Sequence, residues 1–161
     1  MKKFELTTDT KMFLGKKLFR IKALISFGNV KAGDMGGYIE KEENLSQYGD
    51  AWVSGDAKVY GDARVSGDAR VYGDAEVSGD AEVYGDADYA TASGFGSEYR
   101  TTTFFKLKNS DEIGVRCGCF YGTLKEFKEK VKETHGETKK AKEYLMLADL
   151  MEYRFSEEKK A

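Results

Sequence analysis

The chain of 161 residues contains no proline, one histidine, one tryptophan and two cysteines. The two cysteines, Cys117 and Cys119, are too few and too close in sequence for the disulfide framework of a small secreted domain. No apolar run approaches the roughly 18 residues of a membrane span, and no charged-then-apolar leader is present. We therefore expect a soluble, cytoplasmic protein that is not secreted and does not contact a membrane.

The middle of the chain has few basic residues. Residues 48–92 carry 3 basic and 10 acidic side chains, a net charge of -7, whereas residues 1–47 carry +3 and residues 93–161 carry +2. Nucleic-acid binding depends on a basic stripe, because neutralisation of phosphates dominates its free energy. The charge pattern therefore argues against a nucleic-acid partner.

A strict six-residue repeat occupies this acidic middle. A period of six fits neither an α-helix nor a simple β-meander, but it suits short strands joined by Gly-Asp turns, since glycine accepts positive φ and aspartate bonds nearby backbone. Fixed periods are typical of stacked repeat architectures. The valines that mark the period are Val53, Val59, Val65, Val71, Val77 and Val83.

The stretch Val65-Ser66-Gly67-Asp68-Ala69-Arg70 resembles the hexapeptide-repeat, left-handed parallel β-helix family, in which a small residue follows an aliphatic one by four places. The resemblance is specific over residues 48–89 and looser back to Val30. It implies that three hexapeptides form one triangular coil, so that residues 18 apart stack. It also implies a homotrimer, the usual assembly of this family.

Stacking at this spacing places opposite charges on neighbouring coils, in the pairs Lys58–Glu76, Arg64–Glu82 and Arg70–Asp88. Such cross-strand pairs contribute roughly 0.2–1 kcal/mol each. The same spacing alternates serine with tyrosine, so that each ring lies beside a small residue. We interpret most of the variable positions as stacking chemistry.

The two ends differ from the repeat. Alternating apolar residues from Phe19 to Phe27 predict a half-buried strand paired with Phe4–Leu6. We therefore divide the chain into an N-terminal β cap (1–29), a hexapeptide-repeat β-helix (30–92) and a C-terminal ββαα module (93–161). The predicted fold class is mainly β: a short left-handed parallel β-helix with a β cap and a small α+β module.

The C-terminal module is predicted to contain two strands around Asn109–Glu112 and then two helices. Thr123 and Glu126 form a capping box at the start of the first helix, and Gly136 ends it. The second helix has one apolar stripe: Ala141, Tyr144, Leu145, Ala148, Met151 and Phe155. Residues 98–155 resemble a module of uncharacterised phage and prophage proteins, which implies a mobile-element origin and a location in the host cytoplasm.

Catalytic residues are not evident. Acyltransferases of the β-helix family use a histidine on the coil as a general base, and related carbonic anhydrases hold zinc with three histidines, but this repeat has none. The only histidine, His135, lies at a predicted helix end, where the dipole favours a cation. Cys117 and Cys119 could bind a metal with His135, yet strand periodicity puts both on the apolar face. We expect no catalytic residue, metal or cofactor.

The candidate binding residues are on the repeat: Tyr60, Tyr72, Tyr84, Asp62 and Asp80. The tyrosines either form an aromatic contact surface or stack on the coil, and the aspartates either mimic phosphates, hold a cation or cap their own turns. We expect a non-catalytic oligomeric binding protein, encoded by a phage or mobile element, that inhibits a host enzyme or defence system through protein contacts or ligand sequestration. The alternative is an acyltransferase-like hexapeptide enzyme, supported by fold analogy alone.

Overall fold

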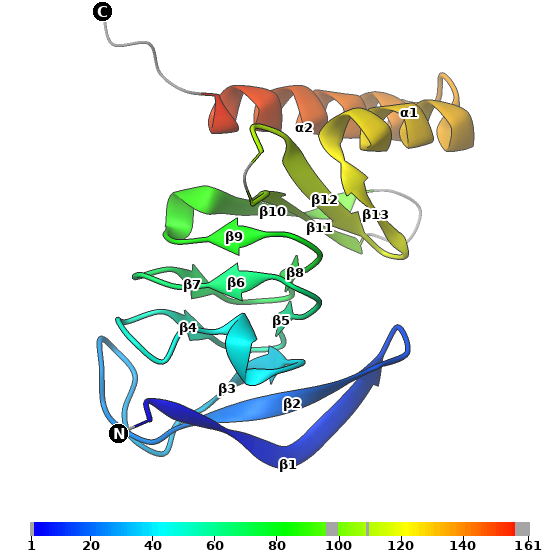
Figure 1. The fold of residues 1–161 in the computed structure, drawn as a ribbon. Helices are drawn as coiled ribbons and strands as arrows, with labels where there is room; N and C mark the ends of the chain where they lie inside the picture. Colours follow the sequence, from blue (N-terminus) through cyan, green and yellow to red (C-terminus); the bar gives the residue numbers. More distant parts are fainter. Residues whose placement is uncertain (1, 96–99, 109, 157–161) are drawn as a thin grey trace, which may run out of the picture.

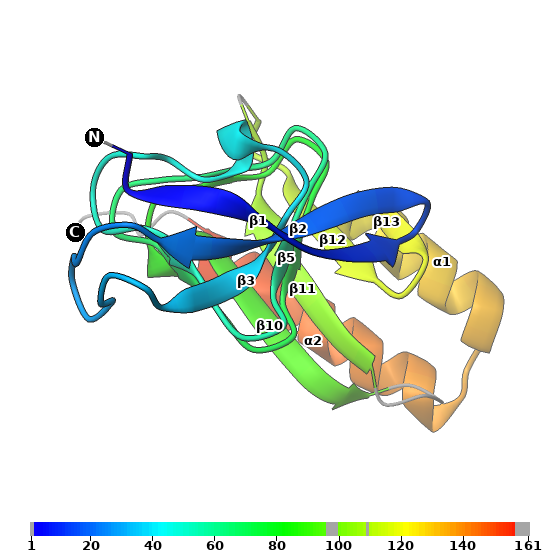
Figure 2. The same ribbon diagram turned by 90° about the horizontal axis from the view of Figure 1, so that it is seen from below.

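The computed structural model describes residues 2–95, 100–108 and 110–156 (Figures 1 and 2). An N-terminal hairpin lies at one end, a stack of turns follows, and a four-stranded sheet with two helices lies at the other end (Figure 1). Asn109 of the predicted turn, and residues 96–99 and 157–161 of the predicted module, lie outside the described residues. None of the described helices is long and apolar enough to cross a membrane.

The N-terminal hairpin joins β1 (Phe4–Phe13) to β2 (Lys16–Ala23). Phe4 lies opposite Ala23 and Leu6 opposite Ile21, which confirms the predicted pairing, although β2 ends before Phe27. β2 pairs antiparallel with β3 (Met35–Ile39), and β3 pairs in parallel with β5 (Lys58–Val59). A short 3₁₀ helix, η1 (Glu42–Asn44), follows β3.

Each repeat contributes a strand of two residues: β4 (Trp52–Val53), β5, β6 (Arg64–Val65), β7 (Arg70–Val71), β8 (Glu76–Val77) and β9 (Glu82–Val83). β4 pairs with β7, β5 with β8 and β6 with β9, all in parallel, which confirms the spacing of 18 residues. Asp88 departs from the expected pattern: it lies in a second 3₁₀ helix, η2 (Asp86–Asp88), and forms an ion pair with Lys106 at 3.1 Å instead of Arg70.

The predicted fold class, a mainly β protein built on a left-handed parallel β-helix, is wrong. The structure is mixed: a five-stranded sheet of order β1-β2-β3-β5-β8, a four-stranded antiparallel sheet, two separate two-stranded parallel sheets and two helices. No closed parallel β-helix is found in the part of the chain that the structure describes. The repeat strands are only two residues long and stack in three columns, β4-β7, β5-β8 and β6-β9. The antiparallel cap extends only the β5-β8 column, so the three columns form small sheets of unequal size.

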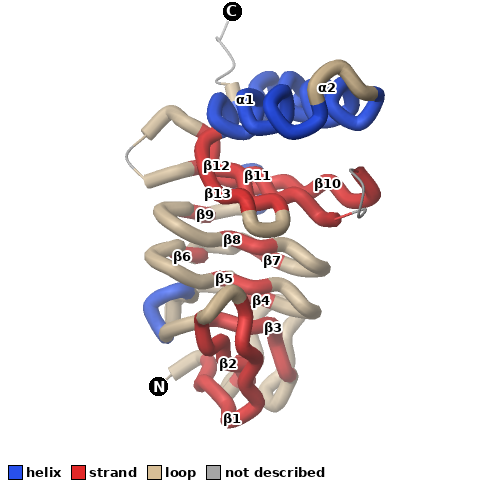
Figure 3. Tube along the Cα trace, turned by 90° about the vertical axis from the view of Figure 1, so that its right-hand side faces the viewer, coloured by secondary structure: helices blue, strands red, loops and turns tan. Residues whose placement is uncertain are grey.

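The C-terminal sheet has four antiparallel strands rather than the expected two: β10 (Tyr89–Phe95), β11 (Arg100–Lys106), β12 (Ile113–Cys117) and β13 (Phe120–Thr123). α1 (Leu124–His135) and α2 (Lys139–Phe155) cover the face of this sheet that points away from the stacked turns (Figures 1 and 3). The capping box is confirmed: Thr123 Oγ1 accepts from the Glu126 N–H at 3.2 Å, and Glu126 Oε1 accepts from the Thr123 N–H at 3.0 Å.

The sheet separates two apolar cores. Phe105 and Leu107 join the core of repeat valines and alanines, whereas their neighbour Phe104 joins the core beneath the helices. Successive side chains of a strand point to opposite faces. β11 therefore attaches the helical layer to the stacked turns through one continuous strand.

Candidate binding site

The structure places the three predicted tyrosines apart. Tyr60 follows β5 and is 3% exposed, whereas Tyr72 follows β7 and Tyr84 follows β9, with exposed fractions of 64% and 56%. These strands belong to three different columns of the stack. The rings therefore do not form one contiguous patch, and their role in binding remains a prediction.

Asp62 and Asp80 do lie together, in an open groove of about 480 Å³ that also contains Lys41, Arg64 and Lys108. Asp62 Oδ1 accepts from Lys41 Nζ at 3.1 Å, and the Asp80 carbonyl accepts from the Lys108 N–H at 2.8 Å. Basic neighbours thus offset the acidic edge, which weakens it as a phosphate mimic. No cluster of three histidine, cysteine, aspartate or glutamate residues suited to a metal occurs among the described residues.

In two of the repeat turns, a backbone hydrogen bond closes the turn in place of the expected cap by the aspartate side chain. The Ala63 N–H donates to the Tyr60 carbonyl at 3.4 Å, and the Ala81 N–H donates to the Ser78 carbonyl at 3.3 Å. Backbone groups alone close these turns. The Asp62 carboxylate instead accepts from Lys41, whereas at the last turn the Asp86 and Asp88 carboxylates do accept backbone N–H groups.

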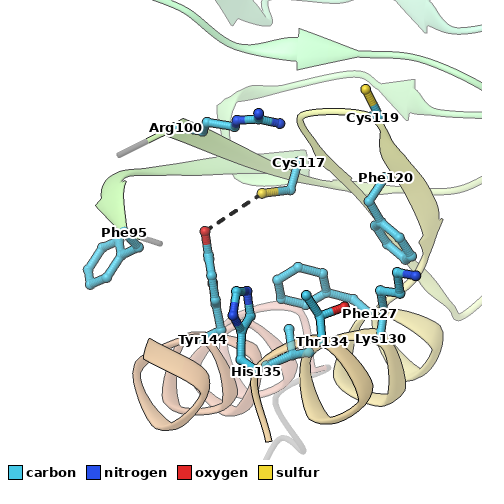
Figure 4. Close-up of a pocket in the computed structure, with 11 residues that line it drawn as sticks. Phe95, Arg100, Cys117, Cys119, Phe120, Phe127, Lys130, Thr134, His135 and Tyr144 are labelled. Atoms are coloured by element: carbon cyan, nitrogen blue, oxygen red, sulfur yellow. Dashed lines mark hydrogen bonds between the residues drawn. The ribbon is translucent and has the colours of Figure 1, made fainter. Parts of the chain in front are cut away.

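A different candidate site lies between the C-terminal sheet and the two helices. A cavity of about 330 Å³ opens there, with walls from β10 to β13, α1 and α2 (Figure 4). This volume lies within the range of roughly 300–1,000 Å³ that is typical of small-molecule sites. Its lining residues are Phe95, Arg100, Cys117, Cys119, Phe120, Phe127, Lys130, Val131, Thr134, His135 and Tyr144.

Aromatic rings form much of the wall. Phe127 packs edge-on against Tyr144 with centroids 5.6 Å apart, and Phe120 lies 5.7 Å from Phe127. His135 stacks on Tyr144 at 6.2 Å with an interplanar angle of 26°. Rings held by one another in this way offer flat apolar surfaces that need little reorganisation to receive a ligand.

Polar groups line the floor of the cavity. The Thr102 hydroxyl donates to Cys117 Sγ at 3.2 Å, and Cys117 Sγ lies 3.9 Å from Tyr144 Oη (Figure 4). Burial, with a further contribution from the neighbouring thiol of Cys117, raises the pKa of Tyr144 to about 12. The phenol of Tyr144 is therefore a neutral hydrogen-bonding group at physiological pH.

Among the described lining residues of the cavity, the charged side chains have one sign: Arg100 and Lys130 are basic, and none of these residues is acidic. Lys130 is exposed and reaches the cavity from α1 (Figure 4). The basic side chains among the described lining residues favour an anionic ligand over a cationic one.

Sequence reasoning assigned Cys117 and His135 to structure alone and so missed this cavity. His135 is the last residue of α1, as predicted, yet it also lines the cavity. Cys117 is half-buried at the edge of the helical core, but Cys119 is exposed in the turn after β12, so the prediction that both face the core is wrong for Cys119. The one feature of the sequence that could have indicated the cavity is that β13 and α1 are rich in aromatic and basic residues.

Comparisons with known proteins add no relative: no family model matches the chain, and a search of curated proteins finds no significant match.

Proposed function

We propose that the protein is a non-catalytic binding protein that holds a small organic anion in the cavity between β12, β13, α1 and α2. The observation that carries this proposal is the combination of aromatic walls with exclusively basic charged groups among the described lining residues. Apolar walls with a few placed polar groups are the usual form of a ligand site. The ligand therefore combines a flat apolar body with a carboxylate or phosphate.

The arrangement favours binding over catalysis. A cysteine nucleophile needs a base within hydrogen-bonding reach, but the hydrogen-bond partners of Cys117 are the hydroxyls of Thr102 and Tyr144. His135 contacts the Tyr144 ring rather than the thiol. These contacts hold the side chains in place and position them as walls of the cavity.

The biological setting that we propose is a phage or mobile element, which is the origin implied by the resemblance noted in the sequence of residues 98–155. In a host cytoplasm, a mobile-element protein that removes a small anion from solution inhibits the host process or defence that depends on it. The homotrimer that the family resemblance implies stays an untested prediction, and this proposal does not depend on it because the cavity is built within one chain.

Three small aromatic compounds test the ligand class: phenyl phosphate, benzyl alcohol and benzylamine share one ring and differ in charge. We expect isothermal titration calorimetry to rank them in that order, with Lys130→Glu weakening phenyl phosphate binding at least about tenfold, the equivalent of about 1.4 kcal/mol. Lys125→Glu makes the same charge change on α1 outside the lining residues and is the matched control. Equal binding of benzylamine, or equal losses in the two variants, would contradict the proposal.

A further inference from the structure

Exposed apolar side chains are concentrated on the outer face of α2. Met146, Leu150 and Tyr153 are 71%, 56% and 81% exposed. Their spacing of four and three residues places them on one face of the helix. The opposite face of α2, which includes Ala141, Tyr144, Ala148 and Met151, is buried in the helical core. Single exposed apolar residues are ordinary, but a row along one helix is typical of an interface.

Two opposite charges flank this row, and no ion pair holds either of them within residues 2–95, 100–108 and 110–156. These are Glu143 and Arg154; by contrast, Asp149 and Glu152 of the same helix both bind Lys128 of α1. Glu143 and Arg154 are separated by about three helical turns. Glu143 lies before the apolar row and Arg154 directly after it, and the midpoint between them falls between Ala148 and Asp149.

We propose that α2 pairs antiparallel with α2 of a second copy of this chain, around a two-fold axis at the level of Ala148. In this arrangement, residues equally far from the axis face each other. Met146 packs against the partner's Leu150, and Glu143 faces the partner's Arg154. Tyr153 lies over the side chain of the partner's Lys142, in a cation–π contact.

The charges select the antiparallel orientation. A parallel pair would place each Glu143 at the level of the partner's Glu143 and each Arg154 at the level of the partner's Arg154, so neither charge would face an opposite one. In a two-fold interface every contact occurs twice, so the antiparallel pair gains two opposite-charge contacts. The surface is therefore complementary to itself, which is why we assign a second copy as its occupant.

The groove beside α2 extends this surface onto the stacked turns. Tyr72, Asp86, Leu150, Tyr153 and Arg154 line an open groove of about 620 Å³. In the antiparallel pair, the basic start of the partner's α2 lies over this end of the helix, toward the acidic Asp86. The pairing gives the exposed Tyr72 a binding role that its position among the repeats did not reveal.

The interface is small, which sets the expected affinity. A helix of 17 residues is about 25 Å long, so one face of it buries an area at the low end of specific protein interfaces. We therefore expect a reversible dimer with a dissociation constant in the micromolar range.

Sedimentation velocity over a concentration series tests the pairing. We expect the wild type to pass from monomer to dimer, and Arg154→Glu or Glu143→Arg alone to weaken the dimer at least about tenfold by creating two like-charge contacts. The double variant Glu143→Arg/Arg154→Glu exchanges the charges and should restore dimerisation. Leu150→Glu should abolish the dimer, whereas Met12→Glu, at another exposed apolar residue on β1, should not.

All of these positions are exposed or half-buried, and circular dichroism will verify that each variant keeps its helices. A wild type that stays monomeric up to about 200 µM, well above a micromolar dissociation constant, would overturn the proposal. So would a double variant that fails to recover the dimer, or a trimer that all variants form equally. Because the cavity is built within one chain, failure of this pairing leaves the ligand-binding proposal standing.

Discussion

At the scale of single residues, the most unusual feature is a group of buried polar atoms around Glu76. Tyr60 Oη, Ser78 Oγ, Glu76 Oε1 and Arg116 Nε are buried, and none of them makes a well-formed hydrogen bond within the described residues, although Tyr60 lies close enough to Ser78 and Glu76 for the groups to interact. Burial raises the pKa of the Glu76 carboxyl, although Lys58 and Arg116 favour its charged form. Burial also raises the pKa of Tyr60 to about 12. A buried polar atom without a partner destabilises the fold.

We predict that Glu76→Gln stabilises the protein at neutral pH, because glutamine has a similar shape and does not bring a charge into this site. A gain of about 1 kcal/mol corresponds to about 2–4 °C in melting temperature for a protein of this size. The folded pKa of Glu76 lies above its unfolded value, so the folded state prefers the protonated acid. The difference in melting temperature between Glu76→Gln and the wild type should therefore be largest at pH values above the folded pKa of Glu76. It should disappear below about pH 4.5, where the carboxyl is protonated in both the folded and the unfolded state.

Thermal unfolding at several pH values measures this effect. Glu82→Gln is the matched control, since Glu82 occupies the same position in the next repeat and its carboxylate accepts from the exposed Tyr84 hydroxyl. A pH-independent gain for Glu76→Gln, or an equal gain for Glu82→Gln, would contradict our account of the buried cluster.

At the scale of elements, the repeated turns have the same backbone but different surroundings. Gly67 and Gly73 adopt φ of +65° and +67°. A Cβ atom on Gly67 would collide with the Tyr84 carbonyl oxygen of the turn above, whereas one on Gly73 would meet no atom within 4 Å. Substituting the two glycines by alanine therefore distinguishes two contributions to the free energy of unfolding. Gly73 reports the penalty of a side chain at positive φ alone, and Gly67 reports this penalty together with steric crowding between turns.

We predict that Gly73→Ala costs about 1–2 kcal/mol, the penalty of a side chain at positive φ. Gly67→Ala should cost about 1–3 kcal/mol more, because the stacked turns must move apart. Urea denaturation of the two variants gives the comparison. Equal costs would mean that turns 18 residues apart are not in contact at Gly67.

The sequence predicted the local elements well where a physical signal repeats or is short in range. Opposite Lys58 lies Glu76, as expected from the spacing, and the Thr123 capping box begins α1. It did not predict that β3 would pair with both the hairpin and β5, because that contact depends on segments far apart in the chain. The cavity was missed for the same reason: Cys117, Lys130 and Tyr144 belong to three elements, and only their packing brings them together.

At the scale of the whole molecule, β11 connects the two cores. Phe105, fully buried, packs with the repeat valines, and the adjacent Phe104, also fully buried, packs with Phe127 of α1. The end of the strand adds a further link, since Leu107 forms a bridge with Ala81. The predicted boundary between residues 92 and 93 therefore does not coincide with a gap in packing, and the stacked turns and the helical layer should unfold together.

The position of the single tryptophan allows a direct test of this cooperativity. Trp52 lies near the N-terminal hairpin, packed against Phe4 and Phe27, whereas both α-helices lie at the other end. We predict that tryptophan fluorescence and helical circular dichroism report one coincident urea transition, the behaviour of a two-state domain. Phe105→Ala should lower the free energy of unfolding by about 3–5 kcal/mol, and both signals should report the same loss. Tyr48→Ala, at an aromatic residue that is 86% exposed, should shift neither transition. If the helical signal of the wild type is lost at lower urea than the Trp52 signal, the helical layer is an independent unit, and the coupling that we assign to β11 is absent.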